Sequence, residues 1–177
     1  MIEVLQVETE FAQLRALYQK VAPAGVLEIG TYQGGTLREW LIHGDPLRVV
    51  AVDIDHVNPE LYEEWRQPHT FLQVITGDSH SPEVRAQIEE FAPYDWAFID
   101  GDHGDHGVRP DADFVLPLMR PGGHLVFHDL VGDRTQPSYA PGQVVDALEN
   151  QGYEVTRFID RFYDSSAHGI GVVRIPE

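Results

Sequence analysis

Short apolar runs alternate with amphipathic segments along the whole chain. Runs rich in Val, Ile, Leu and aromatic residues predict seven β-strands, over residues 24–30, 47–55, 70–78, 94–100, 124–129, 153–160 and 169–175. Apolar residues at helical spacing predict helices before residue 23, over 34–44 and 81–91, around 112–119 and over 142–152. This alternation predicts right-handed crossovers and a parallel sheet.

The strands differ in their expected pairing. Most are almost entirely apolar, which is typical of strands buried on both faces of a sheet. The last two are joined by a loop too short for a helix, so we expect them to be antiparallel. The pattern therefore predicts a single α/β domain over residues 1–177. Its parts are an N-terminal helix in 1–22, a core in 24–130, and a loop, helix and terminal strand pair in 131–177.

Composition narrows the function classes. The chain has 177 residues, 42% of them hydrophobic, and a formal net charge of −17. This negative charge argues against binding to nucleic acid or to anionic membrane surfaces, and it favours a cation or a cationic ligand. Cysteine is absent, so any metal must be held by oxygen and imidazole. No apolar run reaches about 18 residues and the first residues lack a secretory pattern, so we expect a cytoplasmic protein.

Acidic residues end five predicted strands in succession. In a parallel sheet these ends meet at one edge, where ligands of open α/β sheets bind. One such acid would be an ordinary solvated side chain, but five favour a shared site. The stretch FIDGDHGDHG, residues 98–107, is the densest part of this edge and suggests a metal, proton chemistry or both. The five acids are Glu28, Asp53, Asp78, Asp100 and Asp129.

The first loop, EIGTYQGG, is typical of a nucleotide-binding turn although it lacks the full dinucleotide pattern. Gly30 and Gly34 allow a sharp turn close to a ligand. Asp53 follows at the end of the next strand, where a carboxylate can accept both ribose hydroxyls. Glu28 at the head of the loop would repel a pyrophosphate. An acidic pocket instead favours S-adenosylmethionine, which carries a sulfonium and an ammonium group.

The motifs VLEIGTYQGGT, VVAVDID, ITGDS, YDWAFIDGDH and RPGGHLVFHD together resemble class I S-adenosylmethionine-dependent methyltransferases. The second half resembles more closely the small-molecule O-methyltransferases that use a divalent cation, including the macrolide-sugar methyltransferases and the cephalosporin-hydroxylase-type group. The resemblance implies a doubly wound, Rossmann-like sheet of seven strands, mostly parallel with an antiparallel last strand, and helices on both faces.

The resemblance also implies roles for individual residues. Asp53 matches the ribose-binding acid, and Asp100 matches an acid that contacts the cofactor region and binds metal. His103 matches a catalytic base, and His128 and Asp129 match a pair that completes the metal site. The chain departs from the pattern at His128, where a carboxylate is usual. The cofactor-binding set implied is Glu28, Gly30, Thr31, Tyr32, Gly34, Asp53, Asp78, Ser79 and Asp100.

These assignments lead to a hypothesis for the function. Asp100 and Asp129 end adjacent strands, so with His128 they would suit Mg²⁺ or Mn²⁺, and Fe²⁺ is a further option. His103 would remove a proton from the hydroxyl of a small acceptor. Two alternatives stay open. One is a non-haem metal-dependent hydroxylase on the same fold, and the other is a non-catalytic cofactor-binding module. A homodimer is a further hypothesis, since a second copy would cover the pocket.

Overall fold

The computed structural model describes residues 4–132, 140–162 and 168–177. It contains one sheet of seven strands in the order β3-β2-β1-β4-β5-β7-β6. Only β7 runs against its neighbours, and it pairs antiparallel with both β5 and β6. The predicted α/β sheet with an antiparallel last strand is therefore confirmed. The strands are β1 (Gly25–Ile29), β2 (Arg48–Asp53), β3 (Phe71–Thr76), β4 (Tyr94–Ile99), β5 (Met119–Phe127), β6 (Glu154–Phe158) and β7 (Ile170–Arg174).

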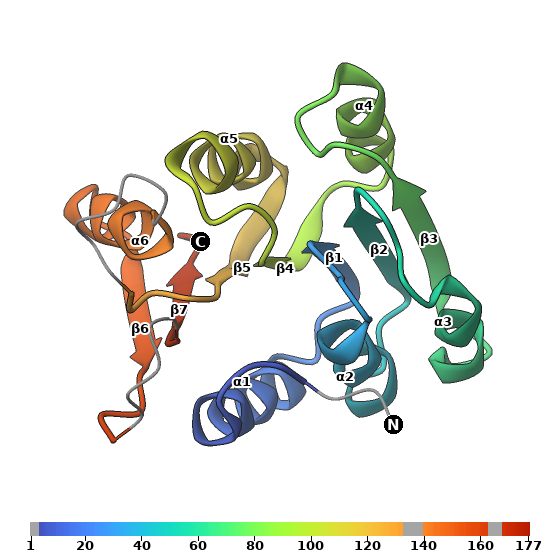
Figure 1. The fold of residues 1–177 in the computed structure, drawn as a ribbon, viewed down its shortest axis with the longest axis horizontal. Coiled ribbons are helices and arrows are strands. Elements are labelled where there is room, and N and C mark those ends of the chain that lie inside the picture. The colour runs from blue at the N-terminus through green and yellow to red at the C-terminus, as the bar shows by residue number, and fades with distance from the viewer. Residues whose placement is uncertain (1–3, 133–139, 163–167) are drawn as a thin grey trace.

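Helices cover both faces of this sheet (Figure 1). On one face lie α1 (Glu8–Val21), α2 (Gly35–His43) and α3 (Pro59–Trp65). On the other lie α4 (Pro82–Glu90), α5 (Asp105–Val115) and α6 (Pro141–Asn150). Successive strand residues enter different cores: Leu27 packs with the α4–α6 side, and Val26 with the α1–α3 side. Burial on both faces explains why the strands are apolar throughout.

Three local features differ from the prediction. Helix α3 was not predicted, because a single buried residue, Tyr62, makes too weak a periodic signal. Strand β5 begins at Met119, five residues before the predicted start, and its register with β4 shifts beyond Tyr94. The helix predicted around 112–119 instead begins at Asp105 and ends at Val115, and a short 3-10 turn, η1 (Leu116–Leu118), follows it.

The strand order places a crevice between β1 and β4. The chain winds outward from β1 through β2 and β3, and then returns to place β4 on the other side of β1. Loops at the carboxyl ends of β1 and β4 therefore leave toward opposite sides of the sheet. A crevice at such a reversal is the usual ligand site of doubly wound folds. The residues that line it follow Ile29 and Ile99 directly.

Candidate functional site

Two cavities meet at the crevice between β1 and β4. The larger has a volume of about 850 Å³ and the smaller about 310 Å³. Gly30, Tyr32 and Asp100 line both of them. Two connected hollows over the strand ends could hold one elongated ligand, or two ligands that react with one another.

The larger cavity combines apolar and acidic walls. Val52, Ile54 and Val57 supply apolar surface, and the last two are at least half exposed. Asp78 and Ser79 lie on the same wall, beyond β3. Asp78 is exposed, and its Oδ1 accepts a hydrogen bond from the backbone N–H of His80 at 2.9 Å. This lining suits a flat heterocycle with hydroxyl groups nearby.

Asp53 holds the loop that separates the two cavities. Its Oδ2 accepts hydrogen bonds from the backbone N–H groups of Thr31 and Tyr32, at 2.7 and 2.8 Å. Its Oδ1 accepts one from the N–H of Asp55 at 3.1 Å. A carboxylate has about four acceptor sites, so Oδ1 keeps capacity for a ligand hydroxyl. Asp53 therefore both shapes the loop and faces the larger cavity.

His56 supports the same loop through the Thr31 hydroxyl, and the sequence did not indicate this role. Its Nε2 lies 2.9 Å from the carbonyl oxygen of Ile75, which can only accept, so Nε2 carries the proton. Its Nδ1 then accepts from the Thr31 hydroxyl at 3.0 Å. No pattern in the sequence marks His56, because its partner Ile75 lies on β3, 19 positions further along the chain.

Two residues of the predicted cofactor set lie behind the cavity walls. Glu28 lines neither cavity; it is fully buried, and the Thr36 hydroxyl donates to its Oε1 at 2.6 Å. Burial raises the pKa of Glu28 to about 8, so the carboxyl is largely neutral at pH 7. The expectation that its charge attracts a cationic ligand is therefore not met in this structure. Thr36 is the member of this pair that reaches the smaller cavity.

Gly34 is likewise a structural residue. It caps the start of α2 with a φ of 84°, and a β-carbon there would lie 2.6 Å from the Tyr62 ring. Gly34 does not line either cavity. It is required by the close packing of α2 against α3, whereas its neighbours Gln33 and Gly35 face the smaller cavity.

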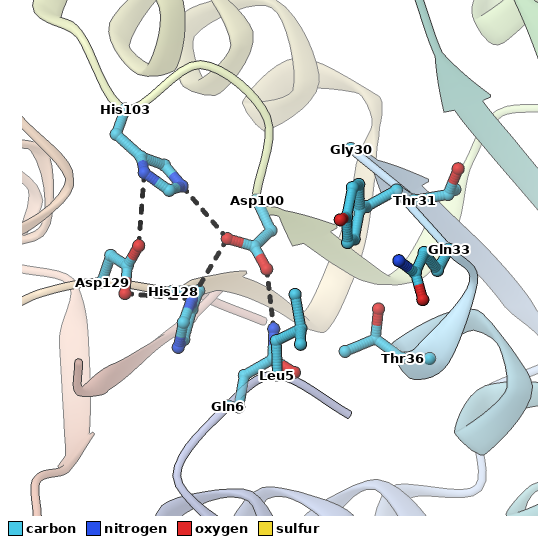
Figure 2. Close-up of a pocket in the computed structure, with 12 residues that line it drawn as sticks. Leu5, Gln6, Gly30, Thr31, Gln33, Thr36, Asp100, His103, His128 and Asp129 are labelled. Carbon is cyan, nitrogen blue, oxygen red and sulfur yellow. Dashed lines mark hydrogen bonds and ion pairs between the residues drawn. The ribbon is translucent and has the colours of Figure 1, made fainter. Parts of the chain in front are cut away.

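The smaller cavity contains a cluster of two acids and two histidines (Figure 2). His103 bridges the acids: its Nε2 lies 3.2 Å from Asp100 Oδ1, and its Nδ1 lies 3.2 Å from Asp129 Oδ2. Nδ1 of His128 also lies 3.2 Å from Asp100 Oδ1 and 3.2 Å from Asp129 Oδ1. β4 and β5 are adjacent, which is why the acids at their ends meet.

The acids and histidines of this cluster shift one another's pKa values, and burial contributes to the shifts. The hydrogen bond to Asp100 raises the pKa of His103, and the charges of Asp100 and Asp129 add to the effect. Burial opposes the charged form of His128, but the Asp100 carboxylate outweighs it and raises the pKa of His128. Burial raises the pKa of Asp129. The two carboxylates therefore favour a positive charge between them, on His103 or on a bound cation.

The donor set fits a divalent cation. One ligand atom from each of Asp100, His103 and Asp129 lies within 4.8 Å of the other two. Two carboxylates and an imidazole suit Mn²⁺ or Mg²⁺. The predicted set contained His128 where this group has His103. His128 contacts both acids through Nδ1, while its Nε2 is buried and has no hydrogen-bond partner among the described residues.

Other parts of the acidic stretch are structural. Asp102 accepts a hydrogen bond from the N–H of Gly104 at 2.8 Å, which forms the turn into α5. Asp105 opens α5 and pairs with Arg109 at 2.9 Å. His106 is exposed in the first turn of that helix, away from the cluster. Asp102 lines the larger cavity, and of the two histidines in this stretch only His103 enters the site.

Gln6 is a further site residue that the sequence did not indicate. It precedes α1, and its Nε2 donates to Asp100 Oδ2 at 2.7 Å. Leu5 lines the same cavity with most of its side chain exposed. The predicted wall over 131–141 lies largely outside the described residues, which omit 133–139.

Known proteins support the architecture. Residues 27–130, over half of the chain, match the family described as "Methyltransferase domain". The chain is similar to a rhamnosyl O-methyltransferase of Mycobacterium leprae, with 26% identity over 162 residues that cover 85% of this chain and 69% of that protein. Across the part of the chain that the structure describes, no helix is both long and apolar enough to cross a membrane.

Solved structures agree on the fold. An O-methyltransferase from Bacillus cereus in complex with SAH superimposes with a TM-score of 0.73 at 19% identity, over 98% of this chain and 82% of that one. The MycE methyltransferase of mycinamycin biosynthesis, in complex with Mg, SAH and mycinamycin VI, gives 0.66 at 19% identity, over 93% of this chain and 49% of that one. This chain therefore spans about half of the MycE chain.

Proposed function

This chain belongs to the methyltransferase domain family, as a class I S-adenosylmethionine-dependent enzyme, and we propose that it methylates a hydroxyl group of a small metabolite with the help of a divalent cation. One observation carries the proposal: His103 bridges Asp100 and Asp129 in a cavity that adjoins the cofactor loop. A proton acceptor and a candidate cation site thus lie next to the place where a methyl donor would end.

The cofactor would occupy the larger cavity and enter the smaller one. Asp53 Oδ1 would accept a ribose hydroxyl, and the apolar side chains of Ile54 and Val57 would flank the adenine. The methionine part would follow Gly30 to Thr36 along the smaller cavity. Asp100 lines both cavities and would lie beside the sulfonium, where its negative charge is favourable.

The cluster would hold the cation and receive the proton. When bound, S-adenosylmethionine supplies the methyl group, and a divalent cation would lower the pKa of an acceptor hydroxyl beside it. Asp100 and Asp129 are the residues that would hold that cation, through oxygens of the group whose ligand atoms lie within 4.8 Å of one another. His103 would stay uncoordinated, because a neutral imidazole has one lone-pair nitrogen, which either binds a cation or accepts a proton. In its neutral form, His103 would use that nitrogen to take the hydroxyl proton.

A sugar hydroxyl is the acceptor that we favour. The similarity to a rhamnosyl O-methyltransferase supports this class, and the polar walls of the smaller cavity suit a polyhydroxylated ring. Membership of a methyltransferase family disfavours the two alternatives, an iron-dependent hydroxylase and a cofactor-binding module. A homodimer stays a proposal, and sedimentation velocity would test it.

The test is methyl transfer with a defined acceptor panel. The chain is incubated with S-adenosylmethionine and methyl α-L-rhamnopyranoside, with catechol as a phenolic comparison, in the presence of Mg²⁺, Mn²⁺ or EDTA. We expect a methylated rhamnoside, detected by mass spectrometry, whose formation requires the ion. Full activity in EDTA would remove the cation from the proposal. Methylation of catechol alone would change the acceptor class.

A further inference from the structure

Gln6 connects the N-terminal segment to the centre of the site. It lies 94 positions before Asp100, and its Nε2 donates to Asp100 Oδ2 at 2.7 Å. Figure 2 shows the amide nitrogen pointing at the carboxylate, with Leu5 beside it. Gln6 as a whole residue is only 9% exposed. A segment outside the sheet thus closes one side of the smaller cavity and contacts the site directly.

This contact restricts the Asp100 carboxylate. The other oxygen, Oδ1, lies 3.2 Å from both His103 Nε2 and His128 Nδ1. Because Gln6 occupies Oδ2 from the opposite side, the carboxylate cannot rotate without breaking a short hydrogen bond. Oδ1 is consequently the oxygen that Asp100 directs toward His103 and Asp129.

The orientation of the Gln6 amide is determined by its partner. An ionised carboxylate only accepts hydrogen bonds, so the NH₂ group must face Asp100. The amide oxygen Oε1 then lies buried, without a hydrogen-bond partner in the ranges that the structure describes. An unpartnered buried carbonyl is destabilising, because it loses its hydrogen bonds to water. An apolar side chain would avoid that cost, so fold stability alone does not explain a glutamine here.

Contacts far from the cavity hold Gln6 in place. Glu10, in the first turn of α1, accepts hydrogen bonds from the N–H groups of Asp160 and Gly169, at 2.7 and 2.8 Å. Thr9 donates to the Asp160 carboxylate at 2.6 Å. These residues flank the connection between β6 and β7. The N-terminal segment is therefore attached to the terminal strand pair, which fixes the reach of Gln6.

We propose that Gln6 is a positioning residue for Asp100, and that by holding Oδ2 it leaves Oδ1 as the oxygen offered to a divalent cation. The inference rests on the cation-assisted function proposed above. A hydrogen-bonding partner of a metal-binding carboxylate orients that ligand, and its removal costs about 10–100-fold in ion affinity. The N-terminal segment is then part of the cation site although it contributes no ligand.

The test compares Gln6→Met with Gln13→Met in the full chain. Both replace a glutamine by a side chain of similar length. Gln13, however, is exposed, and its one hydrogen bond among the described residues is to the backbone oxygen of Thr9, at 3.0 Å. Titration calorimetry with Mn²⁺ should show affinity about 10–100-fold weaker in Gln6→Met and unchanged in Gln13→Met. The melting temperature of Gln6→Met should stay within about 2 °C of the parent. Its affinity for S-adenosylhomocysteine should stay within about twofold, which is about 0.4 kcal/mol.

Three other outcomes would overturn the inference, each in a distinguishable way. Equal Mn²⁺ affinity in Gln6→Met and the parent would reject the positioning role and leave the cation-assisted function intact. A parallel fall in melting temperature and in both affinities would make Gln6 a structural residue. A parent chain that binds no Mn²⁺ would remove the cation-assisted function, and the role of Gln6 with it.

Discussion

Gly30 and Asp100 approach one another so closely that a β-carbon on Gly30 would lie 2.5 Å from the carbonyl carbon of Asp100. Gly30 also has a φ of 86°, a conformation that other residues adopt with strain. The contact joins the loop after β1 to the loop after β4 at the crevice between the cavities. Gly30 is therefore needed for the fold of the site before any ligand is considered.

Gly30→Ala should destabilise the protein by more than backbone strain alone. Gly152 supplies the control, since its φ is 97° and a β-carbon there would have no neighbour within 4 Å. We expect Gly152→Ala to cost about 1–2 kcal/mol from strain. Gly30→Ala should cost at least about 2 kcal/mol more, because backbone must move. Urea unfolding measures both, and equal losses would show that the loop after β4 yields easily.

Asp53→Asn should weaken binding of S-adenosylhomocysteine by about 1–3 kcal/mol, or roughly 5–150-fold. The change removes the charge that organises the N–H groups of Thr31 and Tyr32 and that would accept a ribose hydroxyl. Asp55→Asn is the matched control, because Asp55 is exposed on the same cavity and its loss changes net charge equally. If both variants bind alike in calorimetry, the ribose assignment to Asp53 is wrong.

Asp129→Asn should lower Mn²⁺ affinity far more than Asp102→Asn. Asp129 contributes to the group of three candidate ligands, whereas Asp102 forms a turn. Asp129 has a φ of 57°, which asparagine tolerates well, so the substitution should not strain the chain. Titration calorimetry with Mn²⁺ decides the matter, and similar affinities in the two variants would exclude Asp129 as a ligand.

Glu28 should make folding stability fall as the pH rises. Its folded pKa is raised from 4.5 to about 8 by burial, so the folded state binds the proton more tightly than the unfolded state. This stabilisation is complete below about pH 4.5 and is lost as the pH rises through about 8. The integrated loss is about 5 kcal/mol at most, at about 1.4 kcal/mol for each pH unit.

Glu28→Gln keeps the shape of the neutral carboxyl and removes its titration. Urea midpoints between pH 5.5 and 8.5 should therefore decline less steeply in the variant than in the parent. Parallel pH profiles would mean that the Glu28 carboxylate is stabilised when charged, and that the neutral form assigned to it is incorrect.

His103→Ala should lower kcat by about 10²–10⁴-fold with an acceptor from the panel, the usual contribution of a general base. Because the hydrogen bond to Asp100 raises the pKa of His103, the base form accumulates only as the pH rises above about 6.5. The rate of the parent should therefore rise as the pH increases above about 6.5, and a bound cation would move this rise to lower pH.

His106→Ala serves as the control for His103, since His106 is exposed on α5 and makes no contact with the cluster among the described residues. It should retain the rate and the pH profile of the parent. Retention of both in His103→Ala would assign activation of the hydroxyl to the cation alone.

The sequence was sufficient for the fold class and for the edge of the sheet at which the site lies. Apolar runs and helical spacing are local signals, so six of the seven predicted strands overlap the observed ones closely, and the antiparallel last strand followed from loop length. Parallel strands bring their carboxyl ends to one edge, and four of the five predicted acids line the cavities there: Asp53, Asp78, Asp100 and Asp129. The fifth, Glu28, is buried behind that edge. Helix α3 was missed because it buries one residue, Tyr62.

Only the tertiary structure decided which polar groups meet and in what charge state. Gln6 reaches Asp100 across 94 positions, and nothing in its local sequence marks it. Glu28 has the residue type of a ligand-binding acid, but full burial makes it neutral near pH 7 and places it behind Thr36. His103 faces the two acids with both ring nitrogens, whereas His128 faces them through Nδ1 alone, and only the folded chain sets these directions. Burial and long-range pairing depend on the whole fold, so the pattern of residue types along the chain does not reveal them.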